Sequence, residues 1–228
     1  MMAGYVLPAP PCPSVAVSFT TDRFPVRRIF CVGRNYADHA REMGHDPIAE
    51  PPFFFTKPGD AVIDSGTTIP YPPATADLHH EAELVVAIGR PGTAVAVADA
   101  LVLVWGYAAG NDLTRRDVQA AAKAARRPWD MAKAFDRSAV VGALRPASMG
   151  VPSGRIQCRV DGVITQDADL AEMLWPVPDI IAHLSRLVTL RPGDLIFTGT
   201  PAGVGPVARG QSCDVRIDGL APAQVHIA

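Results

Sequence analysis

Short apolar runs separated by turn residues recur along the chain, and this pattern predicts mostly strands. Runs of four to eight residues rich in Val, Ile and Phe, bounded by Gly, Pro or Asp, are typical of β-strands. We expect strands at the following stretches: 28–32, 53–57, 84–88, 101–108, 195–198, 214–217 and 224–227. Further strands are expected over residues 140–163, where Asp161-Gly162 predicts a tight hairpin turn.

Three helices are expected between these strands. The first covers residues 36–43, with Asn35 as its N-cap and Gly44 as its stop. The second covers residues 115–127, is rich in alanine and ends before a proline. The third covers residues 177–187, where apolar side chains repeat at helical spacing. Many short strands and a few short helices predict a β-rich α+β fold.

The first 25 residues differ from the rest because they are rich in proline and weakly patterned. We expect residues 1–25 to form an extended arm with one short strand over residues 15–19, and residues 26–228 to form the main domain. The arm is too short to bury a core of its own. It is expected to pack on the main domain or on a partner subunit.

Composition narrows the class of protein. Of the 228 residues, 48% are hydrophobic and 19% are charged, and the formal net charge of -2 gives no sign of a nucleic-acid or membrane-surface partner. No apolar run is long enough to predict a membrane span, and the N-terminus lacks the basic region of a signal peptide. The four cysteines are scattered, which favours buried thiols over disulfides or a zinc site. We therefore expect a cytoplasmic protein.

Three carboxylates lie where predicted strands begin or end. Glu81 and Glu83 are two residues apart at the start of a β-branched run, so their side chains point to one face. Asp112 follows the next apolar run. Buried carboxylates need a compensating cation, and three oxygen ligands suit a hard divalent ion such as Mg²⁺, Mn²⁺ or Ca²⁺. The alternative is that these acids are exposed charges, each near a lysine or arginine.

Candidate catalytic groups lie on either side of these acids in the sequence. His39 and Glu42 share a helical face, and a carboxylate beside an imidazole makes the basic group that activates a water molecule. The alternative for this pair is an exposed surface helix. Lys133 lies in a mostly apolar stretch, where a lysine either reaches out to solvent or is functional.

Candidate binding groups occur in the second helix and near the C-terminus. Arg116, Gln119 and Lys123 share one helical face by their spacing. We expect Arg116 and Gln119 to lie close to Asp112, and Lys123 to be solvated further out. The glycine-rich turn 199–205 either holds a carboxylate with its backbone N–H groups or is an ordinary turn.

Six stretches together resemble the fumarylacetoacetate hydrolase (FAH) family. They occur in the family's order and span most of the chain from residue 28 onward. The stretches are VGRNYADHAREMG (32–44), FFFTKP (53–58), LHHEAELVVAIG (78–89), GYAAGNDLTRRDVQ (106–119), PWDMAKAFD (128–136) and LIFTGTPAGVGP (195–206). Within the family the chain is similar to the acylpyruvase branch. The blocks PPFFFTKP, GNDLTRRD and RPWDMAK are most similar to bacterial fumarylpyruvate hydrolases of the gentisate pathway.

The resemblance implies an FAH-type mixed β-sandwich roll, a Mg²⁺ or Mn²⁺ cofactor and a homodimer. It also implies a role for each candidate residue: Glu81, Glu83 and Asp112 bind the metal, His39 and Glu42 activate water from a helix that can act as a lid, Lys133 faces the substrate, Arg116 and Gln119 line the pocket, and Thr200 belongs to the loop for the substrate carboxylate. The implied reaction is metal-dependent hydrolysis of the C–C bond of a 2,4-dioxo acid (an acylpyruvate). Fumarylpyruvate, which gives fumarate and pyruvate, is the favoured substrate.

Three other functions remain open from the sequence. They are oxaloacetate decarboxylation, the isomerase or decarboxylase reaction on 2-hydroxyhepta-2,4-diene-1,7-dioate, and a non-enzymatic role as a metal-binding or dimer module. A dicarboxylic substrate such as fumarylpyruvate also needs a cation for its distal carboxylate. Arg34, Lys57 and Arg116 are the candidates for that contact.

Overall fold

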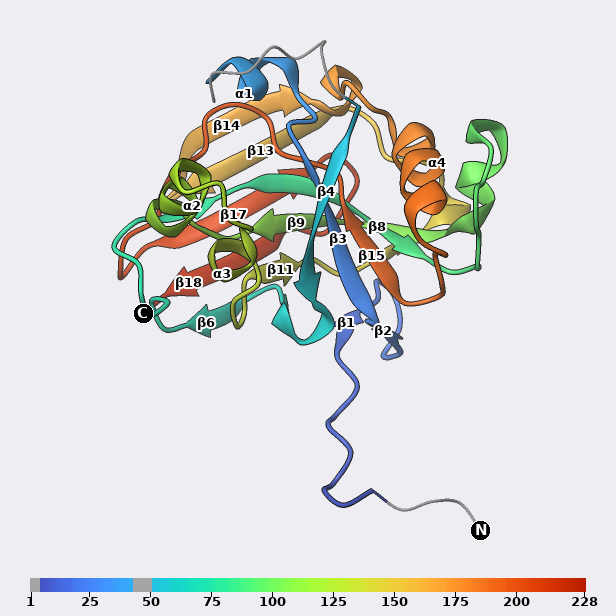
Figure 1. Cartoon of the computed structure of the whole chain (residues 1–228), viewed down its shortest axis with the longest axis horizontal. Coiled ribbons are helices and arrows are strands. Elements are labelled where there is room, and N and C mark those ends of the chain that lie inside the picture. The colour runs from blue at the N-terminus through green and yellow to red at the C-terminus, as the bar shows by residue number, and fades with distance from the viewer. Residues whose placement is uncertain (1–4, 43–50) are drawn as a thin grey trace.

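Two β-sheets packed face to face form most of the molecule, and short helices lie at their edges (Figure 1). The computed structural model describes residues 5–42 and 51–228, without the side chains of Ala40 and Glu42. The predicted β-rich fold with a few short helices is confirmed. No helix in the described ranges is long and apolar enough to cross a membrane.

The larger sheet has eight strands, and the candidate acids Glu81, Glu83 and Asp112 lie on or next to its strands β8 and β9. Its order is β4-β3-β15-β8-β9-β11-β5, with β12 also paired to β9. The bounds are β3 (Arg28–Gly33), β4 (Phe53–Pro58), β5 (Val62–Asp64), β8 (Ala82–Ile88), β9 (Val104–Asp112), β11 (Ala139–Val141), β12 (Arg145–Pro146) and β15 (Asp194–Phe197). The strand expected from residue 101 begins at Val104 instead, because Val97–Leu103 forms a 3-10 helix.

The second sheet has five strands in the order β14-β13-β17-β18-β6. The bounds are β6 (Thr67–Ile69), β13 (Arg155–Val160), β14 (Val163–Asp169), β17 (Ser212–Ile217) and β18 (Ala223–Ile227). The predicted hairpin is confirmed, since β13 and β14 pair antiparallel across the Asp161-Gly162 turn. A small third sheet joins β7 (Leu78–His80), β10 (Thr114–Arg115) and β16 (Gly205–Pro206).

Both faces of the central strand β8 are buried. Leu84 and Val86 point into the main core between the two sheets, whereas Val85 and Ala87 point into a second core on the opposite face. This alternation explains why the strand is a continuous apolar run. By the same alternation, Glu83 lies on the face of the second core.

The helices are short and connect or cover the sheets. Their bounds are α1 (Ala37–Glu42), α2 (Arg116–Ala124), α3 (Asp130–Lys133) and α4 (Val177–Leu187). Helix α4 has the predicted bounds, and Ile180, Ile181 and Leu184 pack it on the main core. Further 3-10 turns cover Gly59–Ala61, Ala147–Met149 and Leu170–Glu172.

Part of the N-terminal arm packs on the main domain. Strands β1 (Ser14–Ala16) and β2 (Arg23–Pro25) pair with each other, and Val15 and Phe24 are buried in the second core. The strand expected over residues 15–19 is wrong at its end, because Phe19 has a positive φ of 67° and is exposed. The division of the chain at residue 25 stays a prediction.

Asn35 does not cap the first helix as expected. Its side chain donates to the carbonyl oxygens of Thr198 and Trp175 and accepts from the Trp175 N–H. The residue therefore ties the start of α1 to the loop after β15. The expected stop at Gly44 lies outside the described residues.

The four cysteines are free thiols, as predicted. Cys31, Cys158 and Cys213 are buried, whereas Cys12 in the arm is exposed. The expectation of buried thiols therefore holds for three of the four.

Candidate active site

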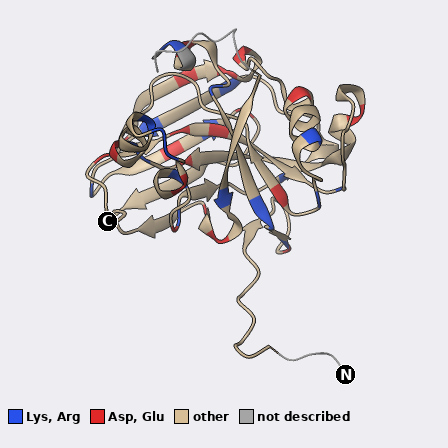
Figure 2. Ribbon diagram, in the orientation of Figure 1, with Lys and Arg blue, Asp and Glu red and all other residues tan. Residues whose placement is uncertain are grey.

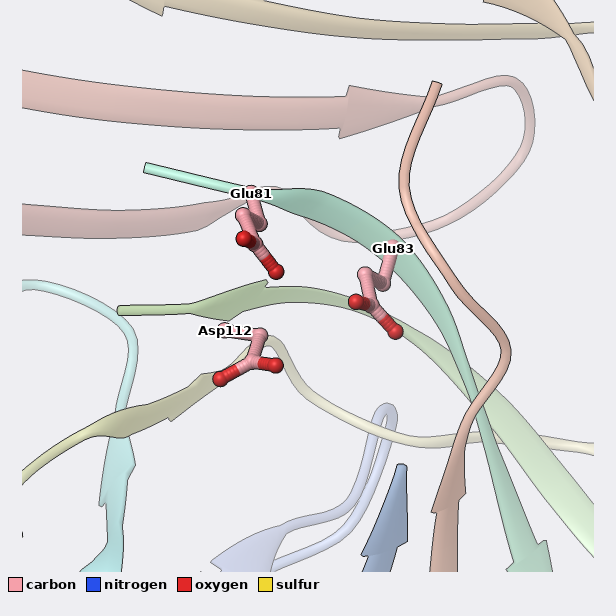
Figure 3. Close-up of side chains that lie close together, drawn as sticks. All are labelled: Glu81, Glu83 and Asp112. Atoms are coloured by element: carbon pink, nitrogen blue, oxygen red, sulfur yellow. The ribbon is translucent and has the colours of Figure 1, made fainter. Parts of the chain in front are cut away.

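The three candidate metal ligands come together on one face of the larger sheet. Glu81 precedes β8, Glu83 is its second residue, and Asp112 ends β9. The strands pair antiparallel with Glu83 opposite Gly110, and the Asp112 N–H donates to the Glu81 carbonyl. This register points the three side chains toward one another, with one oxygen of each within 4.8 Å of the others (Figure 3). The acids are buried together rather than exposed, and their role as metal ligands stays a prediction.

Three cations from other parts of the sequence compensate these acids. Lys57 Nζ lies 2.7 Å from Asp112 Oδ1. Lys133 Nζ lies 2.6 Å from Glu81 Oε2 and 2.8 Å from Asp112 Oδ2, so its ammonium group bridges two carboxylates. Arg116 Nη2 lies 2.6 Å from Glu81 Oε1. Burial opposes ionisation of Glu81, but Lys133 and Arg116 outweigh it and lower the pKa of this carboxyl group.

Glu83 has a different environment from the other two acids. Its Oε2 accepts a hydrogen bond from the Gly199 N–H at 2.7 Å, and within the described ranges it forms no ion pair. Burial raises the pKa of Glu83, and the charges of Asp112 and Glu81 raise it further. Gly199 has a φ of +97°, and a Cβ there would lie 2.7 Å from the Cβ of Asn35, so this close approach requires glycine. Among the described residues, Glu83 is thus the one of the three acids without an ion-pair partner.

The donor set fits a hard divalent cation. The three side chains offer oxygen ligands, the type that Mg²⁺ and Mn²⁺ prefer. Among the described residues, Lys57 Nζ is the one partner of Asp112 Oδ1, at 2.7 Å. In residues 5–42 and 51–228, this is the one group of three or more His, Cys, Asp or Glu side chains close enough to hold an ion.

A hollow, here called the acid pocket, opens onto Glu81 and Glu83. Its lining includes Glu81, Glu83, His39, Arg116, Lys133 and Thr200. His39 lies on α1 and is buried, which places an imidazole beside the acids. Glu42 is the last residue of α1, and its side chain lies outside the described part of the structure. The predicted pairing of His39 with Glu42 therefore stays a prediction.

The predicted substrate-binding residues also line the acid pocket. Arg116 Nη1 donates to Gln119 Oε1 at 2.7 Å, and both side chains come from α2. Thr200 lies in the loop after β15, where its hydroxyl accepts from Gln166 Nε2 at 2.8 Å. Gln166 also accepts from the Ala82 N–H and so ties this loop to β8. No sequence pattern predicts that Gln166 contacts this loop, because Gln166 lies on a strand of the other sheet.

The family follows from this geometry together with one comparison. Residues 28–228 match the family described as Fumarylacetoacetate (FAA) hydrolase C-terminal. The chain belongs to the fumarylacetoacetate hydrolase family. The resemblance drawn from the six motifs is confirmed.

The proteins that are similar to this chain are named for more than one activity. Fumarylpyruvate hydrolase of Ralstonia sp is 43% identical over 183 residues, which are 80% of this chain and 95% of that protein. The crystal structure of fumarylpyruvate hydrolase from Pseudomonas aeruginosa in complex with Mn²⁺ and pyruvate is 48% identical, with a TM-score of 0.95 over 99% of both chains. The mitochondrial oxaloacetate tautomerase of Homo sapiens is 41% identical over 197 residues, 85% of this chain and 88% of that protein. The expected FAH-type fold is confirmed.

Lys57 has a different place in this FAH-family protein from the one expected. At the end of its strand, it was a candidate for contacting a distal carboxylate. The register of β4 with β3 places Lys57 opposite Ile29, on the inner face, where its side chain is fully buried. Its ammonium group also donates to the carbonyl oxygens of Leu113 and Lys133. Lys57 therefore supports Asp112 from within the protein and does not line the acid pocket.

The environment of Lys123 also differs from the one predicted. The sequence predicts a solvated side chain, but Lys123 is half-buried and lines the acid pocket. Because Lys123 lies one helical turn beyond Gln119, the sequence spacing could have indicated that it lines the same pocket. The packing of Trp129 against this lysine, with Nζ 5.1 Å from the ring centre, was not predictable from spacing.

The buried Lys57–Asp112 pair leads to a stability prediction. Replacing Lys57 with methionine is expected to lower the free energy of unfolding by about 3 kcal/mol, since Asp112 would keep a buried charge with one partner fewer. Because Lys133 still contacts Asp112, the expected loss of stability is at the lower end of the range for broken buried ion pairs. Urea denaturation of the metal-free protein measures it.

The matched control for this variant is Arg23→Met. Arg23 forms a 2.7 Å ion pair with Asp64 in which both side chains are partly exposed, so its loss is expected to cost less than about 1 kcal/mol. Equal, small losses for the two variants would contradict a supporting role for Lys57.

Proposed function

We propose that this protein hydrolyses the C3–C4 bond of an acylpyruvate and that fumarylpyruvate is its favoured substrate. One water molecule is consumed, and fumarate and pyruvate are released. The observation that carries the proposal is the acid pocket itself, in which two buried carboxylates, a buried lysine and a histidine line one hollow and a third carboxylate, Asp112, lies directly behind them. Similarity to the fumarylpyruvate hydrolases of Ralstonia sp and Pseudomonas aeruginosa supports it.

In this proposal Glu81, Glu83 and Asp112 hold a Mg²⁺ or Mn²⁺ ion. Glu83, which lacks an ion-pair partner in the described ranges, supplies the charge that most needs a cation. When bound, the ion supplies Lewis-acid stabilisation for the negative charge of the leaving pyruvate enolate. The Pseudomonas aeruginosa enzyme, crystallised with Mn²⁺ and pyruvate, supports this choice of ion.

The protein's own residues then carry out the water attack. His39, oriented by Glu42, removes a proton from a water molecule that attacks the C4 carbonyl. Lys133 is nearly fully buried, and its ammonium group stabilises the oxyanion that forms at C4, where few water molecules compete. The proton on His39 is available for C3 of the departing enolate, which becomes pyruvate.

Three further residues bind the substrate. Arg116 and Gln119 are held together by a hydrogen bond and position the keto acid from α2. Thr200 and the backbone N–H groups of its loop bind the substrate carboxylate. The hydrogen bond from Gln166 to Thr200 keeps that loop in place.

A second candidate is conversion of oxaloacetate by decarboxylation or tautomerisation. It is favoured by relatives of nearly equal similarity, among them the mitochondrial oxaloacetate decarboxylase of Dictyostelium discoideum, 41% identical over 85% of this chain. The chemistry needs a stabilised enolate but no attacking water. Hydrolysis and decarboxylation therefore differ in their need for His39, whereas tautomerisation still needs a group that transfers the proton at C3.

A spectrophotometric comparison of substrates tests the proposal. Purified protein with Mn²⁺ is offered fumarylpyruvate, acetylpyruvate, oxaloacetate and 2-hydroxyhepta-2,4-diene-1,7-dioate, each with and without EDTA. The expected result is loss of fumarylpyruvate with equimolar release of pyruvate, reduced by at least about 10³-fold in EDTA. Turnover of oxaloacetate alone would favour the second candidate, and turnover in EDTA at the full rate would contradict the metal site.

The proposal extends to the oligomeric state, the location and the pathway of the protein. We also infer a homodimer of the gentisate pathway of aromatic-compound breakdown, as the motif resemblance implies, and a cytoplasmic location, as the scattered cysteines indicate. Size-exclusion chromatography with light scattering should give twice the mass of one chain. A single-chain mass at micromolar concentration would contradict the dimer.

A further inference from the structure

Lys123 differs from Lys133 and Arg116, two other cations of the acid pocket, in having no carboxylate partner in the described ranges. Lys133 and Arg116 are both held by Glu81. The ammonium group of Lys123 instead lies 5.1 Å from the ring centre of Trp129 and forms no ion pair with a described residue. A half-buried ammonium group over an aromatic face is well placed to accept an anion from solution.

The surroundings of Lys123 are positively charged. Burial lowers the pKa of Lys123, and the charges of Arg116 and Arg34 lower it further. Arg34 also lines the acid pocket, where its guanidinium lies 5.2 Å from the ring centre of Phe53. Figure 2 shows basic residues at α2 and just after it; of these, Arg116 and Lys123 line the pocket, whereas Arg126 and Arg127 do not. This end of the pocket therefore attracts a negative group.

An aromatic wall connects Lys123 to the metal end of the pocket. The wall consists of Phe53, Phe55 and Trp129, whose rings pack edge to face with centres 5.5 and 6.0 Å apart. Lys133 Nζ lies 5.0 Å from the centre of Phe55, and Lys123 lies over Trp129, whose ring packs against both phenylalanines. A flat, unsaturated chain with a carboxylate at each end matches this order of charge, aromatic surface and charge.

We propose that Lys123, with Arg34 beside it, forms a subsite for the second carboxylate of a dicarboxylic acylpyruvate. This inference rests on the proposed function, in which the keto-acid end of the substrate is bound near Glu81, Glu83 and Asp112. The enoyl segment then lies along the aromatic wall. The subsite selects acyl groups that end in a carboxylate over simple acyl groups such as acetyl.

The kinetic test compares two substrates that differ in this carboxylate. For Lys123→Met, kcat/KM with fumarylpyruvate is expected to fall about 10- to 100-fold, the range for losing a charged hydrogen-bond partner, mainly through a higher KM. With acetylpyruvate, kcat/KM should change less than about threefold, because no group contacts the missing ammonium. Lys123→Arg, which keeps the charge, should retain most of the fumarylpyruvate activity.

Arg126→Met is the matched control. It removes a positive charge from the exposed segment just after α2, at a position that does not line the acid pocket. An equal loss for Arg126→Met would mean that general attraction, rather than a subsite, explains the effect. Equal losses on both substrates for Lys123→Met would also overturn the subsite.

A binding measurement separates this proposal from the proposed function. Fumarate and acetate are titrated into the Mn²⁺-loaded protein while tryptophan fluorescence is followed, because Trp129 lies under Lys123. Fumarate should bind at least about tenfold more tightly than acetate to the wild type, and this preference should disappear in Lys123→Met. If no acylpyruvate is hydrolysed but the preference is present, the proposed reaction is wrong and the subsite stands. Turnover of fumarylpyruvate without any such preference would leave the reaction and overturn the subsite.

Discussion

Replacing Glu83 with glutamine is expected to abolish Mn²⁺ binding and to lower acylpyruvate hydrolysis by at least about 10³-fold. Glutamine has nearly the same shape and can still accept the hydrogen bond from the Gly199 N–H. The fold should therefore be kept while the negative charge that faces Glu81 and Asp112 is lost. Isothermal titration with Mn²⁺ and steady-state kinetics measure the two effects.

A stability measurement shows whether Glu83 acts through the metal. Mn²⁺ at about 100 times its Kd should stabilise the wild type by about 2.7 kcal/mol, seen as a higher Tm, and should leave Glu83→Gln unchanged. Glu172→Gln is the matched control, because Glu172 lies in an exposed capping box and its amide can still accept from the Asp169 N–H. Unchanged Mn²⁺ affinity in Glu83→Gln would remove this residue from the metal site.

Replacing His39 with alanine is expected to lower hydrolysis of fumarylpyruvate by about 10²- to 10⁴-fold, the usual contribution of a general base. The rate of any oxaloacetate decarboxylation should stay within a few-fold of the wild-type rate, because that reaction needs no attacking water. Mn²⁺ affinity should also be unchanged, since His39 is not among the three clustered carboxylates. Parallel assays of the two substrates with one protein preparation provide the comparison.

The outcome of the His39 variant distinguishes a base from a structural residue. His39 is buried on a helix of six residues, so its removal can also disturb packing. Equal losses in hydrolysis and decarboxylation would indicate such a disturbance. His226→Ala, on the distant strand β18, controls for the loss of an imidazole and should keep both activities.

The sequence predicted that Glu81 and Glu83 point to one face because their two-residue spacing is a local pattern. Glu81 and Glu83 share a face through the two-residue period of a strand, and both faces of β8 are buried, as its continuous apolar run indicates. Helix α4 was predicted with its observed bounds because its apolar residues repeat at helical spacing. These features depend on neighbours within one element.

Lys57 and Lys123 were misjudged because their environments depend on pairing and packing between distant segments. The register of β4 with β3 decides that Lys57 points inward to Asp112, 55 residues further along the chain. The wall of Phe53, Phe55 and Trp129 decides that Lys123 borders the acid pocket. Spacing along one helix or strand contains no information about either arrangement.

The sequence by itself determined the family, the β-rich fold and the three acids, which cluster where β8 begins and β9 ends. Only the tertiary structure decided which cations pair with Glu81 and Asp112 and which lysine of the acid pocket has no carboxylate partner among the described residues. The physical reason is that burying three carboxylates is tolerated only when positive groups are brought to them. Those groups come from β4, α2 and α3, and only the folded chain brings them together.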